Sequence, residues 1–173
     1  AWDGGAPAPF AELQRRLEAS LARSRPARAV GLLEVLDLDA LAGRCGPVAV
    51  EELMALLARR LEDAVSPRDT LARTVRGEIT LVLSDCARPL ALRLGRHLGE
   101  AIEGLHLDWG EESFPVRFRL GLRVVDAPLS VDAALTGASA AAALAGSGAG
   151  GVRLYREGDE ARAAADPGSA LAW

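Results

Sequence analysis

The side chains that could carry nucleophilic or metal chemistry in this sequence are few and scattered. Ser84-Asp85-Cys86 places a hydroxyl, a carboxylate and a thiol side by side, but the motif ends an apolar run and is typical of a turn. His97 and His106 lack the clustered Cys or Asp residues that a zinc site needs. All 20 basic residues are arginine, which excludes a Walker-type phosphate lysine and a Schiff-base lysine.

The arginines and glycines offer two candidate anion sites. Arg117, Arg119 and Arg123 share one face of a predicted strand, where they could form an anion-binding stripe. Pairing with Glu34 or with other acids is the favoured interpretation. The glycine-rich segment 146–151 resembles a phosphate loop in composition, but no lysine follows it. A flexible connection is therefore the better interpretation of that segment.

The composition is that of one globular domain. The chain has 173 residues, of which 50% are hydrophobic and 25% are charged, so it can bury a core without disulfides. Its two cysteines favour a reducing, cytoplasmic setting. A net charge of −4 without a long basic run argues against a nucleic-acid partner. We expect no membrane insertion, because no apolar stretch approaches the roughly 20 residues that span a bilayer.

The hydrophobic pattern predicts an α+β fold. Apolar residues recur at helical spacing over 9–24, 48–65, 88–102 and 131–145. Strands are predicted over 29–36, 70–75, 79–83, 114–125 and 152–155, and the second and third form a hairpin. From the first strand onward the order is β-α-β-β-α-β-α-β. This order predicts a central, mostly antiparallel sheet with a ferredoxin-like β-α-β-β-α-β core flanked by helices.

Four short stretches are similar, in order and spacing, to the GGDEF family of bacterial diguanylate cyclase domains. Residues 45–53 (CGPVAVEEL) resemble the family's CGHVAGDEL, and residues 69–73 (DTLAR) resemble the stretch before its signature hairpin. Residues 107–109 (LDW) and 119–122 (RLGL) resemble its F-x-W and S-I-G-L segments. The resemblance runs from about Phe10 to Tyr155 and implies a GGDEF, nucleotide-cyclase-like fold.

The same resemblance implies that the active site has been lost. The signature hairpin G-G-[DE]-E-F corresponds here to Val75, Arg76, Gly77, Glu78 and Ile79. In the family the glycines let the backbone approach the nucleotide phosphates, and the first acid holds a divalent metal. Here both glycines have been replaced by larger residues, and Gly77 stands where the metal-binding acid belongs.

Asp37, at the end of the first strand, matches the family's second metal carboxylate. One aspartate alone holds Mg²⁺ poorly on triphosphate oxygens. The residues themselves also allow a plainer interpretation, in which Asp37 and Asp39 end a strand and cap a helix. We therefore expect no working catalytic residue and no metal or nucleotide cofactor.

The nucleotide-binding regions of the family are also altered. The segment 37–46 is shorter than in the family, so the guanine-binding Asn has no counterpart. The guanine-binding helix carries Val50 and Glu51 in place of Gly and Asp, and both side chains crowd a base-sized pocket. Gly146 stands near the place of a phosphate-contacting lysine. The inhibitory-site pattern R-x-x-D reads Ser66 to Asp69, without its arginine.

The resemblance implies a catalytically inactive regulatory or dimerisation module in cyclic-di-GMP signalling. The tail after Tyr155 is similar to the linker that leads to an EAL phosphodiesterase domain. We thus expect a connecting helix towards an upstream sensor over 1–28, the GGDEF-like domain over 29–156, and a linker towards EAL over 157–173. Two alternatives stay open. One is a weak cyclase that converts two GTP to cyclic-di-GMP with Mg²⁺, using Asp37 and the retained signature acid Glu78 alone. The other is a GTP sensor that does not turn GTP over.

The first predicted helix carries a leucine-rich stripe whose role is open. The stripe consists of Phe10, Leu13, Leu17 and Leu21. We expect this helix to pack on the domain or on a second copy, and to pass movement of the sensor towards the tail.

Overall fold

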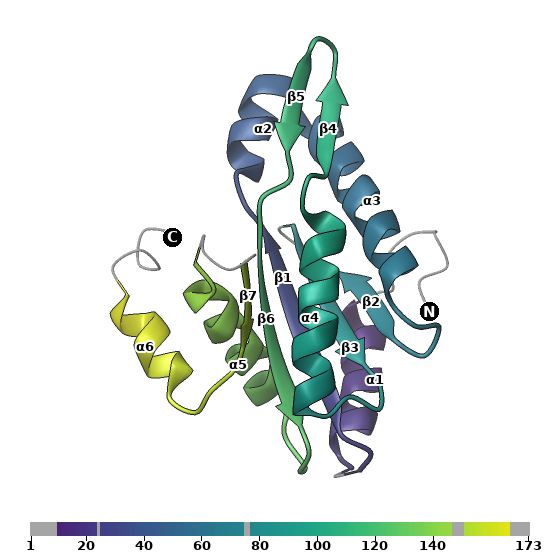
Figure 1. Ribbon diagram of the computed structural model, residues 1–173, viewed down its shortest axis with the longest axis vertical. Coiled ribbons are helices and arrows are strands. Elements are labelled where there is room, and N and C mark those ends of the chain that lie inside the picture. The colour runs from purple at the N-terminus through teal and green to yellow at the C-terminus, as the bar shows by residue number, and fades with distance from the viewer. Residues whose placement is uncertain (1–9, 24, 75–76, 147–150, 167–173) are drawn as a thin grey trace.

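A five-stranded sheet forms the centre of the computed structural model, which describes residues 10–23, 25–74, 77–146 and 151–166 (Figure 1). Its strands are β1 (Arg28–Val35), β2 (Thr70–Arg73), β3 (Glu78–Leu83), β6 (Phe118–Val125) and β7 (Val152–Leu154). They lie in the order β2-β3-β1-β6-β7. Only β6 and β7 pair in parallel, so the predicted α+β fold with a mostly antiparallel sheet is confirmed.

Helices cover both faces of this sheet because alternate strand residues are apolar on each side. On one face α3 (Pro47–Ala64) and α4 (Arg88–Ile102) bury a large leucine-rich cluster that includes Leu33, Leu81 and Leu120. On the other face α1 (Phe10–Leu21) and α5 (Val131–Leu144) pack against a smaller cluster around Val30 and Val82.

The alanine-rich α5 packs closely against the sheet at β6. A side chain at Gly121 of β6 would overlap the carbonyl oxygen of Ala138 in α5. Glycine on the strand and alanine on the helix therefore set this close approach.

The stripe of the first helix turns towards its own domain. Leu17 is 2% exposed and Leu21 is fully buried, and both belong to the smaller cluster. The backbone N–H of Leu129, just before α5, also donates to the carbonyl of Leu21 at 3.2 Å. The side chains of Phe10 and Leu13 lie outside the described residues.

The single strand predicted over 114–125 is wrong. The chain forms β5 (Glu112–Pro115), breaks at Val116 and Arg117, and continues as β6. β5 pairs instead with β4 (His106–Trp109) in a separate hairpin, which projects at the top of Figure 1 beside α2. The break has a physical cause: Pro115 has no N–H to donate, and the N–H of Val116 turns to the carbonyl of Leu105 at 2.9 Å.

Two short helices complete the described chain. α2 (Leu38–Cys45) follows β1 directly and was not predicted. α6 (Asp159–Ala165) lies in the tail, which was expected to be a linker, and it contacts α5. Among the described residues, no helix is long and apolar enough to cross a membrane.

Candidate functional site

The candidate site lies where the β2–β3 hairpin meets the end of β1. The backbone N–H of Val35 donates to the carbonyl of Gly77 at 3.3 Å, and the N–H of Thr74 donates to the carbonyl of Glu78 at 3.0 Å. Ile79 is fully buried in the core. Val75 and Arg76, the two positions where the family has glycine, lie outside the described residues.

Leucine fills the space beside Gly77. This glycine has φ +76°, a left-handed conformation that side chains disfavour. A Cβ built on it would overlap Cδ1 of Leu38, the first residue of α2. Leu38 in turn packs against the main core cluster. A carboxylate at position 77 would therefore need both a strained backbone and a displaced core side chain.

Asp37, which matches the family's second metal carboxylate, is paired with an arginine. Its Oδ2 accepts a hydrogen bond from Nη1 of Arg117 at 2.7 Å, with both side chains more than half exposed. Asp37 stands at the N-cap position of α2 with φ 64°, but its side chain makes no capping hydrogen bond. Asp39 lies in the first turn of α2, where a negative charge favours the helix. Asp37 thus occupies the N-cap position of α2, but it does not make the hydrogen bond of a helix cap.

The predicted pairing of the strand arginines is confirmed for two of the three. Arg117 pairs with Asp37 as described, and Nη1 of Arg123 lies 3.7 Å from Oε1 of Glu160 and donates to the carbonyl of Ala133 at 2.7 Å. The guanidinium of Arg123 also lies 4.2 Å from the ring centroid of Tyr155. Arg119 stands opposite Glu34 in the β1–β6 register.

The acid on the guanine-binding helix is also paired. Glu51 accepts two hydrogen bonds from Arg73, at 3.0 and 3.1 Å, which join α3 to the end of β2. These bonds lower the pKa of the Glu51 carboxyl. Val50 is half-buried against the core. Arg73 belongs to the DTLAR stretch, but sequence reasoning did not identify it as the partner of Glu51.

The inhibitory-site residues act as a turn. Asp69 is 7% exposed and accepts hydrogen bonds from the backbone N–H groups of Ser66 and Ser84, each at 2.9 Å. The two carboxylate oxygens thus join the turn before β2 to the residue that follows β3. Arg68 is exposed and pairs with Asp85 at 3.4 Å.

The histidines and Cys86, which the sequence offered as possible catalytic or metal-binding residues, do not come together in the fold. His97 is exposed on α4, and Nε2 of His106 lies 3.7 Å from Oδ1 of Asp108. No group of three or more His, Cys, Asp or Glu side chains in the described ranges could hold a metal ion. Cys86 is buried and free, and burial raises the pKa of its thiol to about 11, so it is a poor nucleophile.

A buried ion-pair cluster at the other end of the chain was missed entirely. Asp159, at the start of α6, is 0% exposed and accepts from Arg153 at 2.9 and 3.2 Å, Arg162 at 3.0 Å and the N–H of Arg156 at 3.0 Å. Burial raises its pKa, but these hydrogen bonds outweigh burial and hold the pKa at about 2. The cluster joins α6 to β7. Its members are charged residues, which the sequence alone would place at the surface.

The architecture and the strand order define a GGDEF-domain fold, and solved structures agree. The GGDEF domain of TpbB (YfiN) from Pseudomonas aeruginosa is 21% identical with a TM-score of 0.77, and the match covers 91% of this chain and 94% of that one. An EAL/GGDEF domain protein from M. capsulatus is 20% identical, with a TM-score of 0.69 and coverage of 86% and 99%.

A third neighbour was solved with a ligand. The GGDEF domain of DgcB from Caulobacter crescentus, in complex with c-di-GMP, is 15% identical with a TM-score of 0.72 and coverage of 84% and 87%. No protein-family model matches the chain, and no curated protein is similar to it in sequence. The fold is therefore shown by structure alone.

Proposed function

We propose that this chain is a GGDEF-like module of cyclic-di-GMP signalling that makes no product and regulates an adjacent EAL domain in the cytoplasm. The fold supports the signalling context, because the neighbours include a domain solved with c-di-GMP and an EAL/GGDEF protein. The resemblance of the tail to the linker before EAL supports the choice of neighbour.

The packing of Leu38 against Gly77 is the observation that most supports the proposal that the domain makes no product. Cyclisation of GTP needs Mg²⁺ held by carboxylates beside the phosphates. At this site the acid position is glycine, its space is filled by a core leucine, and Asp37 is paired with Arg117. Loss of metal binding and of phosphate positioning together removes more than about 5 kcal/mol of transition-state stabilisation.

The regulatory part of the proposal rests on α5. This helix contacts both α1 and α6, the first and last helices of the described chain. α1 is held by Leu17 and Leu21, and α6 by the ion pairs of Asp159. Movement that an upstream sensor imposes on α1 would thus reach α6 through one packed helix. In the dimeric version of this proposal, α1 also contacts a second copy of the chain.

Purified domain incubated with GTP and Mg²⁺ or Mn²⁺ tests the inactive state. Chromatography should find no cyclic-di-GMP above an enzyme-free blank. Product would show a weak cyclase and overturn the proposal. Isothermal titration with GTP under the same conditions should show no binding, and tight binding without product would establish a GTP sensor instead.

The relay is tested in the full-length protein by phosphodiesterase output. Leu17→Ala should loosen α1 and Asp159→Asn should loosen α6, and each should change the output. Leu92→Ala serves as a control because Leu92 is 39% exposed on α4, on the opposite face of the sheet from α1. Equal output from all four proteins would refute the relay.

A further inference from the structure

Three arginines gather where α1 leads into β1. Arg23 and Arg25 are exposed, whereas Arg28 is 5% exposed. The Arg28 guanidinium donates from Nη1 to Oγ of Ser20 at 3.4 Å and from Nη2 to the carbonyl of Arg23. Its Nε is buried without a hydrogen-bond partner. Across the described ranges, no carboxylate forms an ion pair with any of the three arginines.

Within the described part of the chain, Arg28 is thus a buried cation whose hydrogen-bond partners are neutral. Burial of an unpaired charge is unfavourable, and an anion nearby would offset that cost. The pKa of Arg28 lies below its ordinary value, because burial disfavours the charged form and the guanidinium of Arg23 repels it. A cluster of this kind attracts an anion from solution.

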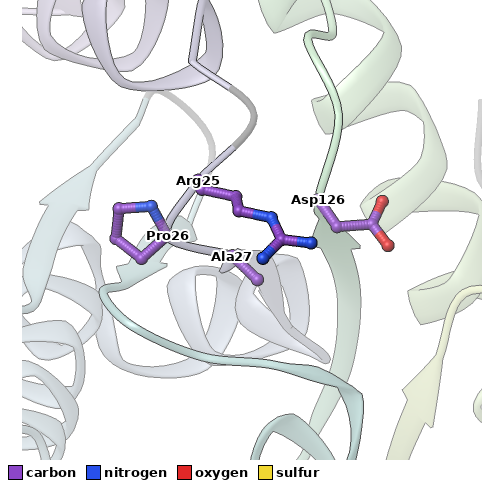
Figure 2. Close-up of a pocket in the computed structure, with 4 residues that line it drawn as sticks. All are labelled: Arg25, Pro26, Ala27 and Asp126. Atoms are coloured by element: carbon purple, nitrogen blue, oxygen red, sulfur yellow. The ribbon is translucent and has the colours of Figure 1, made fainter.

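A hollow of about 650 Å³ borders this cluster. It is lined by Arg25, Pro26, Ala27 and Asp126. Ala27 directly precedes Arg28, and Asp126 directly follows Val125, the cross-strand partner of Arg28. Figure 2 shows the Arg25 guanidinium extending towards Asp126, the residue that follows β6, while the Asp126 carboxylate points away from it. The Arg25 guanidinium therefore faces open space, and the buried Arg28 follows directly on the lining residue Ala27 without lining the hollow itself.

We propose that this hollow binds a phosphate-type oxyanion, which Arg25 contacts directly and which the buried charge of Arg28 attracts. The planar guanidinium fork matches the paired oxygens of such an anion. The volume leaves room for an organic group attached to the phosphate. The site is separate from the β2–β3 hairpin, so anion binding here does not depend on whether the proposed function is correct. Because Arg28 also holds the end of α1, a bound oxyanion stabilises the docked helix.

Titration of the ¹⁵N-labelled domain with inorganic phosphate at constant ionic strength tests the site. Saturable shifts are expected at the amides of Ala27, Arg28 and Asp126. Glycerol 2-phosphate, run in parallel, distinguishes an organic phosphate from the free ion: tighter binding of the ester identifies the organic form, and equal or weaker binding identifies the ion.

Arg25→Gln should weaken phosphate binding about tenfold, as expected for the loss of a charged hydrogen bond. Arg25 is exposed and makes no ion pair with any residue that the structure describes, so this variant is expected to fold even where Arg28→Gln does not. Arg93→Gln, at an exposed position of α4, is the matched control and should change the affinity less than about twofold. Unsaturable shifts, or equal weakening in the two variants, would overturn the proposal.

Discussion

Adding a single methyl group at position 77 tests whether Leu38 closes the site. Gly77 and Gly104 have nearly the same left-handed backbone, with φ +76° and +77°. A Cβ at Gly104 meets nothing within 4 Å, whereas a Cβ at Gly77 overlaps Leu38 Cδ1. Gly104→Ala is therefore a control that carries the backbone strain without the contact.

The expected magnitudes follow from that comparison. Each alanine bears a left-handed penalty of about 1–2 kcal/mol in the free energy of unfolding. Gly77→Ala should cost a further 1–3 kcal/mol or so, the usual range for overpacking, because Leu38 must move within the core. Leu38→Ala alone should cost roughly 1–2 kcal/mol, since its side chain is half-buried. In the double variant the overpacking cost should disappear, which gives a favourable coupling of about 1–3 kcal/mol.

Urea unfolding of the five proteins at 25 °C supplies the assay. Equal slopes with different midpoints would show that only stability changes. Equal destabilisation by Gly77→Ala and Gly104→Ala, or strict additivity with Leu38→Ala, would refute the reasoning. The space at position 77 would then be open to an acid, and the packing argument for an inactive site would fail.

Three further predictions concern the rest of the domain. Leu17→Ala should lower the free energy of unfolding by about 2–4 kcal/mol and exposed Leu92→Ala by far less, because only Leu17 leaves a cavity; equal losses by denaturant titration would contradict the packing of α1. Asp159 has a folded-state pKa of about 2 against an ordinary 3.8, so its ionised form stabilises the fold at pH values above about 4 and that contribution, roughly 2 kcal/mol, is lost as the pH falls towards 2. Asp159→Asn should flatten this acid dependence in pH-resolved thermal melts, and an unchanged profile would exclude the cluster as its source. Iodoacetamide at pH 8 should modify half-buried Cys45 well before buried Cys86 by mass spectrometry, and the reverse order would show that the Cys86 thiol is accessible.

The sequence alone determined the features that depend on neighbours along the chain. Helical spacing of leucines predicted α3 and α4, because one buried face is enough to define an amphipathic helix. The absence of an acid at Gly77 is likewise a property of the sequence, whatever surrounds it. Interruptions of that local pattern were harder to see. The pattern over 114–125 predicted one strand that included Pro115, although proline lacks the N–H that would continue the strand pairing.

Only the tertiary structure decided what occupies the site, because its contacts join residues far apart in the chain. Asp37 meets Arg117, and Glu51 meets Arg73, across different elements. No periodicity predicts such pairs, since they depend on how helices and strands are placed in space. The partners of Asp159 lie close to it in the chain, but its burial also depends on the tertiary structure, because it follows from the docking of α6. Leu38 likewise reads as an ordinary apolar residue until packing brings its methyl group against Gly77.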